Sequence, residues 1–384
     1  MMVKTIFQRD FTRHALKIIR GSNQKRRFAN QTKRLPYSNR RTELDWSLEE
    51  NALQAVAPQI KEDILDDQLE DYVHVPHIRQ RYSKVLDKTT FDLPYRYRSG
   101  ALATVHSYLQ FEKFANVTPE QLKLSCILGW CYRLLVSSMI VYDDILDDQM
   151  VRYNEKPWHK QVGIKEAILD TLFLQSSASY LFSRYFETHP HFLEMLKMLN
   201  KCYATCTIGQ TLEIQTYDLE DFQANEVLIK CFPCTLYPVR TAMYLANIVD
   251  PKLHFAVEQF CWDLVRFIKV EDDMWGQFEP ITNSHKDCTD ASAGRVTWLG
   301  IQVAKYGTPS QKKTFSENYG KNEETALRNI QNIYEEMRIV DHYKKYEEKF
   351  YNEMCECIEN LTKGLPKQLF IDLLDFALIR KFRG

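Results

Sequence analysis

Apolar residues recur every three or four positions along most of the chain after its first forty residues. This is the spacing of one face of an α-helix. It predicts helical segments over residues 122–145, 167–186, 192–217, 227–248, 253–274 and 325–361. Turn-like breaks are predicted at residues 98–100, 154–157, 279–280 and 308–310. Hairpin signals between alternating strands are not apparent, and only 12 glycines occur. The pattern predicts a single all-α domain.

The beginning of the chain has a different composition. Residues 1–41 hold 12 Lys and Arg and one acid, which leaves 38 basic and 50 acidic residues, a net charge of −12, for the remainder. A basic, Arg-rich, acid-poor start is typical of a mitochondrial transit peptide. A basic arm on a cytoplasmic enzyme is the alternative. Residues 1–43 are therefore predicted to be an N-terminal extension and residues 44–384 the catalytic domain.

Composition and charge exclude several classes of protein. Hydrophobic residues make up 45% of the chain and the net charge is −1, so a sizeable core is expected and general nucleic-acid binding is not. No stretch reaches ~18 consecutive apolar residues, so no membrane span is predicted. The ten cysteines lack the spacing of a disulfide scaffold, and a zinc or redox role for Cys231 and Cys234 is the minor alternative to free thiols.

Two aspartate pairs carry the clearest chemical signal. Asp143-Asp144 is followed by Asp147-Asp148, and Asp272-Asp273 lies about 130 residues later. Residues four apart share a helix face, so Asp143 should project with Asp147, and Asp144 with Asp148. A single such pair is usually a solvated surface. Both pairs here follow mostly apolar runs, however, and neighbouring carboxylates resist burial unless a cation neutralises them. Carboxylate oxygens suit Mg²⁺, which also binds substrate phosphates.

At these residues the chain resembles the trans-isoprenyl diphosphate synthases, most closely the farnesyl diphosphate synthases. The resemblance extends from about Leu93 to the C-terminus. It is carried by the segments at residues 128–131, 143–147, 209–213, 238–244, 272–273 and 286–299. It implies an isoprenoid synthase-type helical bundle around a central cavity, usually as a homodimer, acting on an allylic diphosphate with three Mg²⁺ ions.

The allylic half of the site is mostly intact by this resemblance. Asp143, Asp147 and Asp272 are implied to be Mg²⁺ ligands, with Asp144 and Asp273 as supporting catalytic carboxylates. The implied diphosphate-binding residues are Arg152, Gln210, Lys230, Lys286 and Arg295. Gly276 departs from the family because it replaces a third aspartate of the second motif. Lys230 is displaced by one position.

The isopentenyl half of the site departs further from the family. Tyr97 and Gly100 stand at the positions of a Lys and an Arg, Tyr153 at that of a second Arg, and Val136 at that of a Gln. A diphosphate is expected to enter a partly buried pocket only with compensating charge. These positions therefore favour an enzyme that ionises an allylic diphosphate without an acceptor, as in the insect terpene synthases derived from this family.

The prediction is a sesquiterpene synthase that converts farnesyl diphosphate to a cyclic hydrocarbon or alcohol. Its cavity is predicted to be lined by Ser138, Met139, Tyr142, Phe232 and Trp275, although ordinary core packing is the alternative for the aromatic residues. Two other hypotheses remain. One is a short-chain isoprenyl diphosphate synthase, favoured by the basic segment at residues 380–383. The other is a non-catalytic subunit, favoured by Gly276.

Overall fold

The computed structural model describes residues 44–93, 99–213, 219, 222, 235–278, 290–361 and 363–379. Several predicted features lie outside the described residues: the extension at residues 1–43, the segment 95–98 of the isopentenyl site, and the basic segment 380–383. The transit peptide and the domain boundary near residue 44 therefore stay predictions.

The described part of the chain contains no strand, and its single β-bridge joins Arg152 to Glu155. The α-helices are α2 (Ser47–Gln68), α3 (Pro76–Leu86), α4 (Ser99–Phe111), α5 (Pro119–Leu146), α6 (Trp158–Val162), α7 (Ile164–Phe186), α8 (Phe192–Glu213), α10 (Leu236–Leu245), α11 (Pro251–Phe278), α13 (Trp298–Tyr306), α14 (Pro309–Asn318), α15 (Glu324–Glu336), α16 (Ile339–Glu359) and α17 (Lys367–Ile379). The all-α prediction is confirmed.

The structure refines two predicted boundaries. The segment 325–361 forms two helices, α15 and α16, because Arg338 between them has a φ of 53° and cannot continue a right-handed helix. The break predicted at residues 308–310 begins α14. The Thr308 hydroxyl oxygen accepts a hydrogen bond from the Gln311 backbone N–H, and the side-chain oxygen of Gln311 accepts one from the Thr308 N–H. This reciprocal pair is a capping box, which starts a helix.

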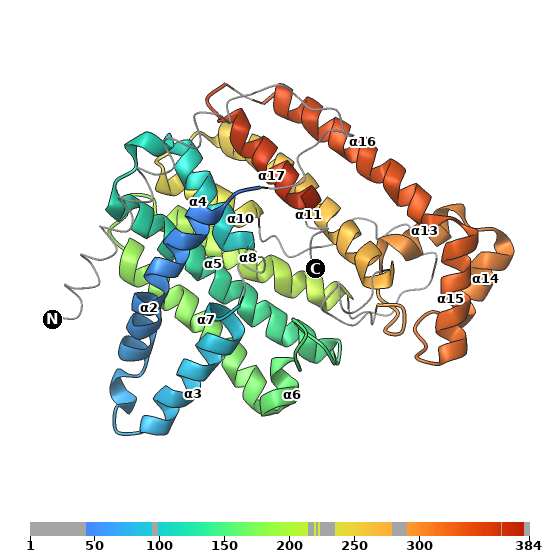
Figure 1. The fold of residues 1–384 in the computed structure, drawn as a ribbon, viewed down its shortest axis with the longest axis horizontal. Coiled ribbons are helices and arrows are strands. Elements are labelled where there is room, and N and C mark those ends of the chain that lie inside the picture. The colour runs from blue at the N-terminus through green and yellow to red at the C-terminus, as the bar shows by residue number, and fades with distance from the viewer. Residues whose placement is uncertain are drawn as a thin grey trace.

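Helix α5 lies at the centre of the larger hydrophobic core and packs against α4, α7 and α2 (Figure 1). Among the described helices, it alone is long and apolar enough to cross a membrane. Its most apolar stretch is 83% buried, as expected of a core helix. Gly129 allows the close crossing of α4, since a Cβ there would lie 3.0 Å from the carbonyl oxygen of Ala101.

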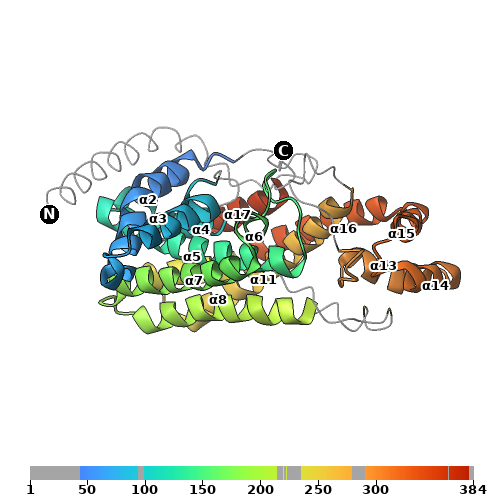
Figure 2. The ribbon, with the colours of Figure 1, turned by 90° about the horizontal axis from the view of Figure 1, so that it is seen from below.

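A second, smaller hydrophobic cluster is built from the C-terminal part of α11 together with α13, α14, α15 and α16. Trp262 of α11 and Tyr346 of α16 pack against both clusters, so these two helices belong to each. Figure 2 shows α13, α14 and α15 gathered at the end of the molecule away from α2 and α3. The two aspartate motifs thus lie near the C-terminal ends of the long helices α5 and α11.

Candidate active site

The end of α5 determines where the first motif points. The helix ends at Leu146, Asp147 is its C-cap, and Asp148 follows with a φ of 48°. Asp144 is buried, whereas Asp148 is exposed and pairs with Lys160. The prediction that Asp144 and Asp148 share a helix face is therefore wrong, because the helix has already ended.

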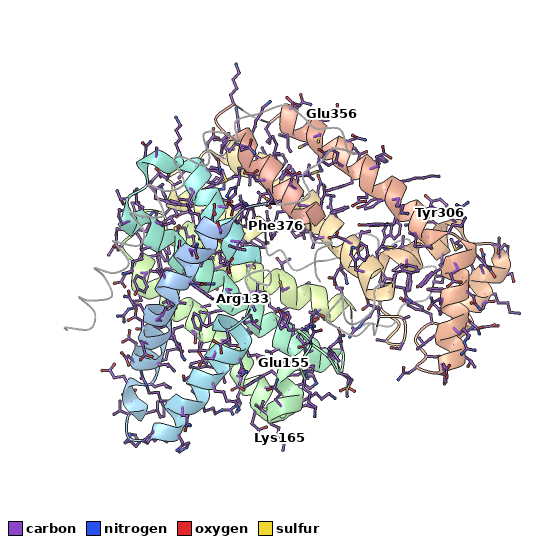
Figure 3. The ribbon with its side chains drawn as sticks, viewed as in Figure 1. Arg133, Glu155, Lys165, Tyr306, Glu356 and Phe376 are labelled. Atoms are coloured by element: carbon purple, nitrogen blue, oxygen red, sulfur yellow. The ribbon has the colours of Figure 1, made fainter. Side chains whose placement is uncertain are left out.

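Arg152 returns to the carboxylates from the loop after α5. Its Nε donates to Oδ1 of Asp144 at 2.7 Å, and its Nη2 lies 3.4 Å from Oδ2 of Asp143. The bridge to Glu155, which Figure 3 labels between α5 and α6, holds this loop. Gln210 of α8 donates its amide N–H to the other oxygen of Asp143. The loop after α5 and helix α8 thus both contribute to the orientation of the first motif.

The second motif lies on α11 and its two aspartates differ. Asp272 is half-buried, whereas Asp273 is buried. Oδ2 of Asp273 accepts a hydrogen bond of 2.8 Å from the backbone N–H of Trp298, the first residue of α13. Its Oδ1 lies 3.1 Å from Nζ of Lys269. Asp273 therefore fixes α13 against α11, and Asp272 is the more accessible carboxylate.

Arg295 connects the segment after the second motif with the first motif. Its Nη2 donates to Oδ1 of Asp147, although the two residues are 148 positions apart. Arg295 is buried, and its Nε has no hydrogen-bond partner among the described residues. A buried guanidinium N–H without a partner is a costly group, and a diphosphate oxygen would satisfy it.

One carboxylate in each motif has surroundings that disfavour its ionised form. Burial, and then the negative charge of Asp143, raise the pKa of Asp147 to about 6, while Arg295 opposes the rise. Burial likewise raises the pKa of Asp273 to about 6, against the effect of Lys269. Carboxylates with raised pKa values attract a cation, since added positive charge stabilises their ionised forms.

The donor set fits Mg²⁺ held together with a substrate. Asp143, Asp147 and Asp272 offer hard carboxylate oxygens from opposite helices. Over the described ranges, no three acidic, histidine or cysteine side chains form a complete metal site by themselves. Mg²⁺ is usually bound by one or two carboxylates, with water and substrate phosphates as its other ligands.

The remaining predicted residues fall into two groups. Lys230, Phe232 and Lys286 lie outside the described residues. Ser138 and Met139 are buried in the core, where the Ser138 hydroxyl donates to the carbonyl oxygen of Thr171 on α7 at 3.0 Å. Tyr142 and Trp275 are half-buried beside the first and second motifs. Their role as cavity lining stays a prediction.

Sequence reasoning missed Lys269 as a residue of the site. It appears in the sequence as an interruption of an apolar run before the second motif. Its spacing of four residues from Asp273 was the available signal, because lysine and aspartate at that spacing can meet on a helix face. The structure confirms that contact and places the ammonium group within electrostatic range of Asp147 as well.

Comparison with known proteins identifies the family. Residues 94–337, which include both motifs and the bases that contact them, match the family described as Polyprenyl synthetase. The chain belongs to this family. Membership supports an enzyme, and a transferase of prenyl groups rather than a lyase. Membership therefore favours an enzyme over the non-catalytic alternative.

Proteins similar to this chain also support a prenyl transferase. A farnesyl pyrophosphate synthase of Bos taurus is 29% identical over 297 residues, covering 74% of this chain and 84% of that protein. One of Murgantia histrionica is 27% identical over 288 residues, covering 73% and 71%. The T. brucei farnesyl diphosphate synthase complexed with risedronate superimposes with a TM-score of 0.77 at 20% identity, covering 88% of this chain and 99% of that one. The last comparison shows the isoprenoid synthase-type helical fold.

The sesquiterpene synthase prediction is therefore wrong. The relatives bear the name of the chain-elongating enzyme and not that of a terpene cyclase. The prediction rested on four single positions of the isopentenyl site. A diphosphate needs positive charge near it but not from a given position of the chain. Val136 and Tyr153 are half-buried in the described structure. The identity of these two residues does not show which charged side chains from other parts of the chain lie near them.

Proposed function

We propose that the protein is a short-chain trans-isoprenyl diphosphate synthase, which condenses isopentenyl diphosphate with an allylic diphosphate. The observation that carries this proposal is the contact of Arg295 with Asp147. It brings an anion-binding group from after the second motif to the metal-binding carboxylates of the first. The family match over residues 94–337 supports the reaction class.

In the proposed reaction the C1–O bond of the allylic diphosphate breaks and the electron pair leaves with the diphosphate. The double bond of isopentenyl diphosphate attacks C1, and one proton is lost. Arg152 and Arg295 stabilise the departing diphosphate by charge-assisted hydrogen bonds. Bound Mg²⁺, held by Asp143, Asp147 and Asp272, would supply Lewis-acid neutralisation of the leaving group. Gln210 and Arg152 position Asp143.

The test uses the full chain with Mg²⁺ in two incubations. One contains geranyl diphosphate and isopentenyl diphosphate, and the other contains farnesyl diphosphate alone. Mass spectrometry of prenyl diphosphates and volatiles should show an elongated diphosphate in the first and no cyclic product in the second. Absence of elongation in the first incubation would overturn the proposal.

A matched pair of variants ties the activity to the site. Asp147→Asn should lower kcat/KM by about 10²-fold or more, as does the loss of a group that stabilises transition-state charge. Asp148→Asn makes the same chemical change one residue later, on an exposed side chain outside the helix. It should leave the rate within about twofold, a change of ~0.4 kcal/mol.

We further propose that the protein is a homodimer and that α7 lies in the interface. Ile164, Ile168, Leu169 and Leu172 are all exposed, and they lie at spacings that form one stripe along the N-terminal half of the helix. Contiguous exposed apolar side chains indicate an interaction surface. A second copy of the chain is the proposed occupant, because dimers with twofold symmetry bury the same patch of both subunits.

A further inference from the structure

The ammonium group of Lys269 lies beside the second aspartate motif and acts electrostatically on the first. It is 3.1 Å from Oδ1 of Asp273 on its own helix, and its side chain is 18% exposed. It also acts electrostatically on Asp147 of the opposite motif. Asp147 and Asp273 are both negatively charged and largely buried. The positive charge of Lys269 therefore stabilises the ionised forms of a carboxylate in each motif.

The three ion pairs of the site differ in where their partners lie along the chain. Arg152 and Arg295 reach their carboxylates from segments outside α5. Lys269 and Asp273 are joined at a spacing of four residues on one rigid helix. The other oxygen of Asp273 accepts a hydrogen bond from the Trp298 N–H, and Asp273 is buried, so Asp272 is the more accessible carboxylate of this motif. The Lys269 charge therefore stays beside the second motif.

We propose that Lys269 is a resident cation of the second motif, which contributes directly to binding the diphosphate group and leaves Asp272 as the metal-binding carboxylate of that wall. The inference rests on the proposed function. The sequence of the second motif supports this role for Lys269. Gly276 lies one turn after Asp272 and has no carboxylate that could bind a further metal ion. A fixed ammonium supplies part of the neutralising charge instead.

The proposal predicts opposite changes for metal and anion. Removing the lysine makes the empty site more negative, so a divalent cation should bind the free protein more tightly. The same change removes a positive charge from the diphosphate, which should bind more weakly. A lysine that only supported the fold would affect both affinities in the same direction or neither.

The experiment uses the full chain, inorganic pyrophosphate and Mn²⁺ as a spectroscopic substitute for Mg²⁺. Electron paramagnetic resonance measures Mn²⁺ binding to the free protein, and calorimetry measures pyrophosphate binding at saturating Mg²⁺. For Lys269→Gln the Kd of pyrophosphate should rise about tenfold and the Kd of Mn²⁺ should fall several-fold, by roughly 3–10 times. Lys269→Arg keeps the charge and should restore both constants to within about threefold.

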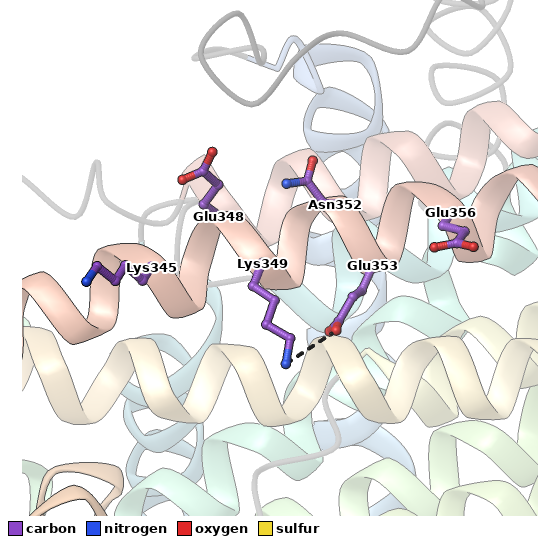
Figure 4. A pocket seen from close by; sticks show the side chains of 6 residues that line it. All are labelled: Lys345, Glu348, Lys349, Asn352, Glu353 and Glu356. Atoms are coloured by element: carbon purple, nitrogen blue, oxygen red, sulfur yellow. Dashed lines mark ion pairs between the residues drawn. The ribbon is translucent and has the colours of Figure 1, made fainter. Parts of the chain in front are cut away.

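A matched control comes from α16. Lys349 and Glu353 also form an ion pair at a spacing of four residues, at 3.6 Å, but on an exposed groove lined by charged side chains (Figure 4). Lys349→Gln makes the same chemical change in solvent and should alter neither constant. Circular dichroism melting of each variant verifies that the fold is retained.

The outcomes separate this inference from the proposed function. Loss of both affinities in Lys269→Gln, or no change in either, overturns the role of Lys269. Failure of the wild-type protein to bind pyrophosphate with metal overturns it too. Neither measurement requires turnover. If the wild-type protein makes no elongated product but the two affinities shift in opposite directions, the proposed reaction is wrong and the resident cation stands.

Discussion

Replacing His106 by glutamine should destabilise the protein strongly, because this histidine joins two buried carboxylates from distant parts of the chain. Its Nδ1 lies 2.9 Å from Oε1 of Glu49 on α2, and its Nε2 lies 3.0 Å from Oδ2 of Asp372 on α17. All three side chains are buried. Trp46 stacks on the imidazole at 4.8 Å and on Phe376, which Figure 3 labels near the centre of the view, at 4.4 Å.

The two contacts require a charged imidazolium, since both ring nitrogens must donate to carboxylates. Burial works to lower the pKa of His106, but the hydrogen bonds to Asp372 and Glu49 outweigh it and raise the pKa above 6.5. Removing one partner of a buried ion pair leaves uncompensated charge and costs about 3–5 kcal/mol. We expect a loss of that size in the free energy of unfolding of His106→Gln.

The pH dependence has a defined sign. A group whose pKa is raised by folding stabilises the native state fully below its unfolded pKa, and that stabilisation is lost as the pH rises through the folded value. Wild-type stability should therefore decline above pH 6.5. The variant lacks the titrating group and should lack this part of the decline. Cys126, whose pKa burial raises above its ordinary 9.0, stays a neutral thiol throughout.

Urea unfolding followed by circular dichroism at several pH values between 6 and 9 is the assay. His77 is exposed on α3, so His77→Gln should change stability by no more than about 0.5 kcal/mol. The triple change His106→Gln, Glu49→Gln and Asp372→Asn removes the stranded charges and should recover part of the loss. A loss below about 1 kcal/mol for His106→Gln, or an unchanged decline above pH 6.5, would show that the triad carries little net charge energy.

Two further predictions concern packing and assembly. Gly300→Ala should cost about 1–3 kcal/mol in urea unfolding, since the new Cβ would lie 2.8 Å from Cδ1 of Phe222 and force that ring to move. Stability equal to the wild type would mean that the ring moves freely. Ile168→Glu with Leu172→Glu should convert a dimer to monomers in sedimentation velocity, whereas Phe255→Glu, at another exposed apolar residue, should not. A dimer that survives both charges excludes α7 as the interface.

Local features of this protein were predictable because their partners are near in sequence. The helical spacing of apolar residues predicted α5, α7, α8 and α11 closely. The shared face of Asp143 and Asp147 follows from the same geometry, and the resemblance of the motif segments led to the family. The contact of Lys269 with Asp273 was also predictable from their spacing of four residues.

Contacts between elements were not predictable from spacing. The sequence contains Arg295, but only the packing of the segment after α11 near the end of α5 brings it to Asp147. The same holds for the Trp298 N–H on Asp273 and for His106 between Glu49 and Asp372. The end of α5 at Leu146 also places Asp148 outside the site.

The sequence by itself thus determined the helices, the motif carboxylates and the family, because each depends on residues within one segment or on their order along the chain. Only the tertiary structure decided which cations neutralise those carboxylates and which aspartate stays accessible. Coulomb interactions depend on distance in space and on burial, and the packing of helices far apart in the sequence sets both. The incorrect inference about the isopentenyl site had this origin, since it counted charge by position along the chain.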